Sequence, residues 1–255
     1  MGRALQGIFV NETVTVGLEE IHRKIRLKDV IVGCSDWSKG SFHDADGVMG
    51  LGYGKHSFAV KAAKLFGNKF SYCLVDHLSP SNLANFLNFG NATSQTLTLK
   101  NMQHTQLILG VINPFYAVNV SGISVAGKML DIPSEVWNVE DKGGVIVDSG
   151  STLAFLVQPA YLATMIALTS PLKNSKRSAV RSGPLEFCYE EAGFELELVP
   201  EFAWHFTDGA KFVPPVKSYV IDAAEGVKCF AFASAEWPGT SVIGNIMQQN
   251  HLVGI

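Results

Sequence analysis

The residues best suited to chemistry stand in one short stretch, Asp148-Ser149-Gly150-Ser151-Thr152. It follows Val145-Ile146-Val147, whose β-branched side chains predict a short buried strand. A carboxylate at the end of such a strand is costly unless hydrogen-bond donors surround it. The glycine permits a tight turn that brings backbone N–H groups toward Asp148, and the two serines add hydroxyl donors. The sequence therefore predicts a carboxylate held at a loop tip, which suits acid–base work on a water molecule.

Asp148-Ser149-Gly150-Ser151 resembles the catalytic Asp-Thr/Ser-Gly-Ser/Thr loop of pepsin-like aspartic proteases. In that family each of two lobes contributes one such loop, and the two aspartates share one proton and activate one water. The resemblance implies that Asp148 is one catalytic carboxylate of such a pair. It also implies that Ser151 bonds the outer oxygen of Asp148 and that Ser149 braces the loop.

Two apolar segments with glycines extend the resemblance. Gly47-Val48-Met49-Gly50-Leu51-Gly52 alternates glycines with apolar residues, which predicts a strand packed under another backbone. A phosphate-binding loop is excluded, because that pattern needs Gly at Met49 and Ser or Thr at His56. In the family such a segment lies under the catalytic loop of the N-terminal lobe. Val242-Ile243-Gly244 is similar to the C-terminal counterpart, which would brace the Asp148 loop.

Composition favours an all-β protein with many turns. The chain has 255 residues, 47% of them apolar and 17% charged, so it can bury a sizeable core. The net charge of −3 and the lack of a basic cluster argue against nucleic acid as a partner. No apolar run approaches the roughly 20 residues of a membrane span. The seven histidines and four cysteines lack metal-ligand spacing, so we expect neither a metal nor another cofactor.

Alternating patterns predict most of the strands, and tight turns separate them. The predicted strands lie in residues 7–34, 70–74, 115–125 and 129–132, around Trp204 and at Tyr219-Val220. The predicted hairpin turns are Ala126-Gly127-Lys128 and Asp208-Gly209.

Two helices are also predicted. Ser57 is a suitable N-cap and Gly67 a suitable stop for the first. Pro159 marks the start of the second, which covers residues 160–168. The expected buried face of the first helix consists of Phe58, Ala62, Leu65 and Phe66.

The order of landmarks resembles the plant nepenthesin-type branch of the family. This resemblance implies an all-β, bilobal pepsin-like fold with a few short helices. Patterning loosens around residues 91–112, so we expect a partial N-terminal lobe over 1–110 and a C-terminal lobe over 111–255, corresponding to xylanase-inhibitor-type N-terminal and C-terminal regions. The landmarks are Gly33-Cys34, Gly47–Gly52, Phe70–Leu74, Phe89-Gly90 and Ile246–Asn250.

The chain departs from the family in having one catalytic aspartate motif. The family's first motif belongs upstream of Gly7, and its final strands continue beyond Ile255. We therefore expect a fragment, truncated at both ends, that holds half of an active site. Asp44 and Asp46 are expected to be solvated loop residues, and Asp208 a turn residue.

The four cysteines are expected to differ. The resemblance implies a disulfide between Cys188 and Cys229, which would stabilise the fold by about 4 kcal/mol in the chain-entropy model. It also implies that Cys34 and Cys73 are free here, because their partners lie outside the chain.

Three glycosylation sequons bear on the compartment. They favour the secretory pathway or an extracellular location, with the plastid as the alternative. The candidate acceptors are Asn11, Asn91 and Asn119.

Two functions compete. The first is an aspartic endopeptidase acting on a peptide or protein, with a monomeric full-length parent and a fragment that is inactive alone. The second is a non-catalytic binding or inhibitor protein of the same fold, as the plant xylanase inhibitors are. The intact Asp148 motif favours the first.

Overall fold

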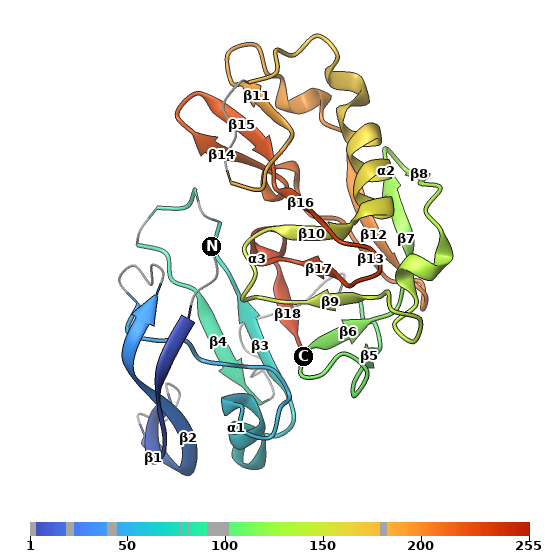
Figure 1. Cartoon of the computed structure of the whole chain (residues 1–255). Coiled ribbons are helices and arrows are strands. Elements are labelled where there is room, and N and C mark those ends of the chain that lie inside the picture. Colours follow the sequence, from blue (N-terminus) through green and yellow to red (C-terminus); the bar gives the residue numbers. More distant parts are fainter. Residues whose placement is uncertain are drawn as a thin grey trace. The chain divides into compact units, whose positions relative to one another are not determined.

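The computed structural model describes residues 4–18, 23–39, 45–76, 78–80, 82–90, 102–178 and 183–255 (Figure 1). Strands dominate and helices are few and short, which confirms the all-β prediction. The chain divides into two compact units. Unit 1 comprises Met1–Ser71, Leu87–Thr93 and Gly254–Ile255, and unit 2 comprises Tyr72–Phe86 and Ser94–Val253.

A long antiparallel hairpin forms the N-terminal part of unit 1. Its strands are β1 (Ala4–Leu18) and β2 (Arg23–Lys39), with Val10 opposite Val32. The strands predicted from the alternation of residues 7–34 are therefore confirmed. β2 continues to Lys39, however, beyond the predicted end at Cys34. Pairing with β1 persists to Ala4, so the backbone gains further hydrogen bonds there whatever the side-chain pattern.

Helix α1 (Phe58–Phe66) packs against β2 and begins and ends where predicted. The Ser57 hydroxyl accepts a hydrogen bond from the Ala59 N–H at 3.1 Å, and Gly67 ends the helix with a φ of 89°. Leu65 is 57% exposed, so its predicted burial is wrong. The buried stripe is centred on Ala59 and Ala62, which places Leu65 at its edge.

The central sheet of unit 2 has the strand order β16-β10-β17-β9-β6-β5. β17 lies between two strands that are close together in the sequence: it runs parallel to β9, with Val242 opposite Ile146, and antiparallel to β10, with Phe155 opposite Val242. The bounds are β5 (Leu107–Ile108), β6 (Tyr116–Val118), β9 (Val145–Val147), β10 (Ala154–Val157), β16 (Phe232–Ala235) and β17 (Ser241–Ile243).

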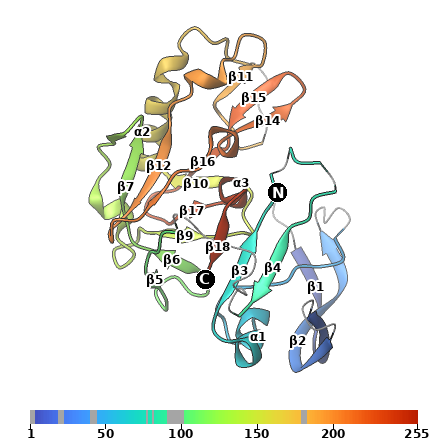
Figure 2. The ribbon, with the colours of Figure 1, turned by 180° about the vertical axis from the view of Figure 1, so that it is seen from behind.

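Three smaller sheets have the orders β13-β12-β7-β8, β11-β15-β14 and β18-β3-β4. Strands β7 and β12 lie side by side both in Figure 1 and in the rear view of Figure 2. Ile123 of β7 stands opposite Trp204 of β12. The bounds are β3 (Phe70–Cys73), β4 (Phe86–Phe89), β7 (Val120–Val125), β8 (Lys128–Met129), β11 (Cys188–Glu190), β12 (Phe202–Phe206), β13 (Lys211–Phe212), β14 (Val220–Ala224), β15 (Val227–Phe230) and β18 (Leu252–Gly254).

The turn before β8 has the predicted residues. Ala126 and Gly127 have φ values of 50° and 75°, as a two-residue hairpin turn requires. The strand predicted over residues 129–132 is too long, because β8 ends at Met129.

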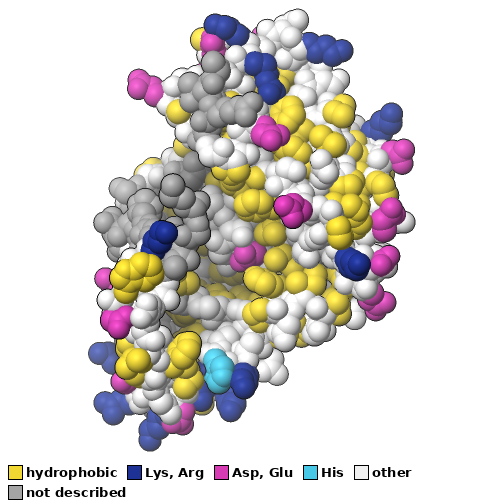
Figure 3. Space-filling model, viewed as in Figure 1, with side chains coloured by type: hydrophobic (Ala, Val, Ile, Leu, Met, Phe, Trp, Pro, Cys, Tyr) yellow, Lys and Arg dark blue, Asp and Glu magenta, His cyan; other side chains and the backbone are white. Residues whose placement is uncertain are grey.

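Helix α2 (Gln158–Thr169) covers one side of the sheets of unit 2 and packs against β7, β10 and β16. Pro159 stands in its first turn, as predicted. Leu162 and Ile166 remain 50% and 69% exposed, and Figure 3 shows hydrophobic side chains on that side of the molecule. The other helices are α3 (Asn245–Gln248) and the 3₁₀ helices Ser134–Trp137, Ser170–Leu172, Leu196–Leu198 and Val216–Ser218.

Aromatic side chains fill the core between the two larger sheets of unit 2. Phe202 contacts Trp204 and Phe232 with ring centroids 5.7 and 5.2 Å apart, and all three are fully buried. Burying each such side chain contributes on the order of 2–3 kcal/mol. These contacts therefore fix β12 of the four-stranded sheet against β16 of the central sheet.

The predicted disulfide is confirmed. Cys188 of β11 and Cys229 of β15 stand opposite each other in the register and are bonded. Cys34 and Cys73 are free thiols, the first exposed and the second partly so.

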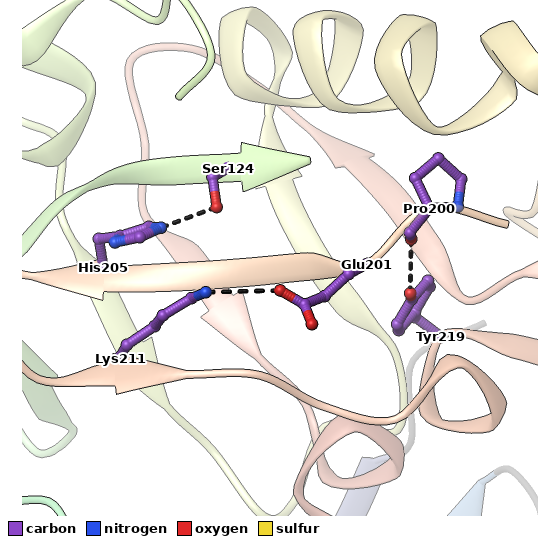
Figure 4. Close-up of polar contacts among 6 residues, drawn as sticks. All are labelled: Ser124, Pro200, Glu201, His205, Lys211 and Tyr219. Atoms are coloured by element: carbon purple, nitrogen blue, oxygen red, sulfur yellow. Dashed lines mark hydrogen bonds and ion pairs between the residues drawn. The ribbon is translucent and has the colours of Figure 1, made fainter. Parts of the chain in front are cut away.

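Polar side chains make hydrogen bonds within and beside the sheet β13-β12-β7-β8 (Figure 4). His205 Nε2 lies 2.8 Å from Ser124 Oγ, and Tyr219 donates from its hydroxyl to the Pro200 carbonyl at 2.7 Å. Burial, and secondly the charge of Lys211, lower the pKa of His205. Burial chiefly raises the pKa of Tyr219 to about 12. His205 and Tyr219 are therefore neutral at pH 7.

This environment predicts a pH-dependent contribution of His205 to stability. A His pKa that is lower in the folded state means that the contribution is complete above the unfolded value of about 6.5 and declines as pH falls through the folded pKa. His205→Gln should cost about 1 kcal/mol at pH 7 through the altered hydrogen bond. It should also reduce the loss of stability between pH 7 and 5. Urea unfolding at both pH values measures this, and equal losses in the two proteins would contradict it.

Candidate active site

The loop that carries Asp148 begins where β9 ends. The Asp148 N–H donates to the carbonyl of Ile243, the last residue of β17, at 3.1 Å. Because β9 and β17 are parallel neighbours, this bond continues their ladder by one residue. The position of Asp148 therefore depends on β17.

Both oxygens of the Asp148 carboxylate accept hydrogen bonds from its own loop. The Gly150 N–H donates to Oδ1 at 2.8 Å, and the Ser151 hydroxyl donates to Oδ2 at 2.7 Å. Hydrogen bonds to a carboxylate are stronger than neutral ones, so they fix its orientation. Asp148 remains partly exposed. The structure thus places an oriented carboxylate where a water or substrate can reach it.

Helix α3 holds the other side of the loop. The Asn245 side chain donates to the Ser149 carbonyl at 3.0 Å, and its backbone N–H donates to the Ser151 carbonyl at 2.7 Å. The Ile246 N–H donates to the Thr152 carbonyl at 3.2 Å. Ser149 and Thr152 thus contribute their carbonyls to the bracing. Asn245 directly follows Val242-Ile243-Gly244, the segment expected to brace the loop, and its side-chain bond was not anticipated.

Gly244 permits the closest backbone approach in this brace. A Cβ at this position would lie 2.1 Å from the Leu153 carbonyl oxygen and 2.9 Å from that of Thr152. Both atoms belong to the backbone that follows the Asp148 loop, so they cannot easily move away. The geometry agrees with the close packing expected of Val242-Ile243-Gly244.

The strand predicted over Gly47–Gly52 is wrong. No strand forms at these residues, and Val48 and Met49 are 75% and 54% exposed. A Cβ on Gly47 or Gly50 would meet nothing within 4 Å. A glycine-rich strand needs a backbone packed against it, and none lies there among the described residues. A bracing role for Gly47–Gly50 stays a prediction.

Two buried polar residues behind the loop were missed by sequence reasoning. Gln248 of α3 donates from Nε2 to the Ile243 carbonyl at 2.7 Å and accepts from the Tyr72 hydroxyl at Oε1. Burial, and secondly the Asp148 charge, raise the pKa of Tyr72. The sequence held little signal for this role, because Gln248 stands among other polar residues, with Gln249 and Asn250 directly after it.

Asp76 is a buried carboxylate of unit 2, and it was also missed. It accepts hydrogen bonds from the Lys217 ammonium, the Leu78 N–H at 2.8 Å and the Asn250 side chain at 3.2 Å. The Lys217 hydrogen bond is the main cause of a lowered Asp76 pKa. With these partners it ties three chain segments together.

The other predicted residues fall outside this arrangement. Asp46 is exposed, and Asp208 caps its own turn by accepting from the Ala210 N–H at 3.3 Å. Asn11 is exposed and Asn119 partly exposed, and glycosylation of either stays a prediction. Asp44 and Asn91 lie outside the described residues.

No metal-ligand cluster occurs among the residues that the structure describes. No helix in the described ranges is long and apolar enough to cross a membrane.

Comparison with known families gives matches over nearly the whole chain. The family model described as "Xylanase inhibitor C-terminal" matches residues 115–255, and "Xylanase inhibitor N-terminal" matches residues 2–91.

Among curated proteins, the chain is 35% identical to Aspartyl protease family protein 2 of Arabidopsis thaliana, covering 97% of this chain and 49% of that protein. It is 32% identical to aspartic proteinase nepenthesin-2 of Nepenthes gracilis, covering 97% of this chain and 54% of that protein. The chain therefore spans about half the length of these relatives.

Among solved structures, Basic 7S globulin from soybean superposes with a TM-score of 0.77 at 17% identity. The match covers 97% of this chain and 64% of the globulin. At this identity the likeness shows the fold alone.

The close approach at Gly244 gives a test of the brace. Gly244→Ala should lower the free energy of unfolding by about 3 kcal/mol, because the new methyl group meets backbone atoms. Gly50→Ala is the matched control, since its methyl group enters open space, and it should change stability by less than about 0.5 kcal/mol. Denaturant unfolding measures both variants. A Gly244→Ala protein as stable as the control would show that the brace tolerates a side chain.

Proposed function

The chain belongs to the pepsin-like aspartic protease family of plants, and on that premise we propose that it carries half of the active site of an aspartic endopeptidase. The observation that carries the proposal is the Asp148 carboxylate, held by the Gly150 N–H and the Ser151 hydroxyl at the end of β9. The named proteases among its relatives support the same class of reaction.

In the proposed mechanism a water attacks a peptide carbonyl between two carboxylates. One carboxylate removes a proton from the water while the other supplies a proton to the substrate. Asp148 is one of the two carboxylates, and separate donors to its two oxygens orient it for this chemistry. The partner carboxylate would come from a second Asp-Thr/Ser-Gly loop, and the present sequence contains only one such motif.

A non-catalytic binding protein is the second candidate. The descriptions of the two family models name xylanase inhibitors, and these cover both halves of the chain. The intact Asp-Ser-Gly-Ser loop favours the protease, because a binding protein has no need of an oriented carboxylate at that position. The second candidate would be favoured if the protein bound a glycoside hydrolase and no form of the protein cleaved a protein substrate.

We also infer passage through the secretory pathway. A disulfide between Cys188 and Cys229 persists in oxidising compartments and is rare in the cytosol. Asn11 and Asn119 belong to sequons with exposed or partly exposed acceptors. A mass shift on glycosidase treatment of protein from plant tissue would test this inference.

The half-site predicts that the 255-residue chain alone has no detectable peptidase activity. Removing one partner of a concerted catalytic pair usually removes most of the rate. A form extended to the length of the relatives, with a second Asp-Thr/Ser-Gly loop, should cleave denatured protein at pH 3–5. Pepstatin should block that cleavage, and Asp148→Asn should abolish it. The assay compares both forms on one substrate.

Asn at position 148 keeps the size of the side chain but removes its charge, so equal unfolding curves would exclude misfolding as the cause. Pepstatin-sensitive cleavage by the 255-residue chain, lost in Asp148→Asn, would contradict the prediction for this chain. An inactive long form with both motifs intact would contradict the proposed function.

A further inference from the structure

A buried chain of hydrogen bonds reaches the Asp148 loop from behind. The Tyr72 hydroxyl of β3 donates to Gln248 Oε1, and Gln248 Nε2 donates to the Ile243 carbonyl at 2.7 Å. The same carbonyl accepts the Asp148 N–H at 3.1 Å. This chain of hydrogen bonds therefore links three segments of unit 2 that are distant in sequence.

The direction of these hydrogen bonds is fixed by chemistry. A backbone carbonyl can only accept, so Gln248 must turn its NH₂ group toward Ile243. Its oxygen then faces Tyr72, whose hydroxyl must donate. Burial and the Asp148 charge raise the pKa of Tyr72, so the hydroxyl keeps its proton over the whole working range of pH.

Burial makes these hydrogen bonds costly to lose. Tyr72 is 5% exposed and Gln248 is 2% exposed, so water cannot easily replace either partner. Leaving a buried amide or hydroxyl without a partner costs about 1–3 kcal/mol. The amide of Gln248 is therefore buried with both of its polar atoms hydrogen-bonded, whereas an apolar residue of similar size would fill the space without these bonds.

We propose that Tyr72 and Gln248 are positioning residues that fix the Ile243 carbonyl and, through it, the backbone of Asp148. The inference rests on the proposed function of Asp148, because it assigns these residues to the same half-site. The carbonyl of Ile243 receives two donors, so it cannot rotate without breaking both bonds. The Asp148 N–H therefore meets an acceptor whose direction is already set.

Amide hydrogen exchange measures this positioning without requiring activity. Gln248→Met keeps the approximate volume but removes both hydrogen-bonding groups. The Asp148 amide should then exchange at least about tenfold faster, while amides within α2, which report the stability of unit 2, change much less. Tyr72→Phe should have a smaller effect in the same direction. Combining it with Gln248→Met should add nothing, because both belong to one chain of bonds.

Two further variants separate positioning from general stability. Ser124→Ala removes a buried hydrogen bond in another sheet, so it should change Asp148 and α2 exchange alike. Gln248→Glu should match wild-type exchange at acidic pH, where a protonated carboxyl can donate to Ile243 and accept from Tyr72. It should resemble Gln248→Met once the carboxyl ionises and loses its donor.

The outcomes are distinct. Selective acceleration at Asp148, with rescue by Gln248→Glu at acidic pH, supports the proposal. Acceleration that is equal at Asp148 and in α2, or no acceleration, overturns it. An extended form that proves inactive would overturn the proposed protease function without changing the exchange result, so the two failures can be told apart.

Discussion

One hydrogen bond, from the Asp148 N–H to the Ile243 carbonyl, joins the two segments on which the candidate site depends. It extends the parallel ladder between β9 and β17 to the first residue of the loop. The remaining contacts act on this junction: α3 binds the loop carbonyls, Gly244 lets the backbones approach, and Gln248 holds the Ile243 carbonyl. Orientation of the carboxylate is thus a property of main-chain pairing, refined by a few side chains.

Local chemistry made part of the structure predictable. Ser57 and Gly67 marked the ends of α1, because capping is decided within a few residues. The donors to Asp148 could be anticipated in the same way, since the Gly150 N–H and the Ser151 hydroxyl lie two and three residues from it. The Asp208 turn follows the same logic. Each of these features depends only on residues that are close together in the sequence, so the local sequence pattern was enough to predict it.

Features that depend on distant partners were predicted less well. The glycines of Gly47–Gly52 indicate room for close packing but do not show that anything fills it, and here Gly47 and Gly50 are exposed. Leu65 fits an apolar stripe whose width is set by the surface that α1 covers. Gln248 and Tyr72 are 176 positions apart in the chain, so their pairing could not be read from either segment. Tertiary contact decided all three cases.

The insertion of β17 between β9 and β10 also constrains the order in which the protein can form. Residues 145–157 emerge from the ribosome before residues 241–243. The central sheet therefore cannot join β9 to β10 until β17 has been made and pairs with both. Pairing across such a separation requires closure of a long loop, which slows folding. Asp148 therefore acquires its backbone acceptor only after Ile243 has been synthesised. Until then the nascent chain carries the aspartate without the framework that orients it.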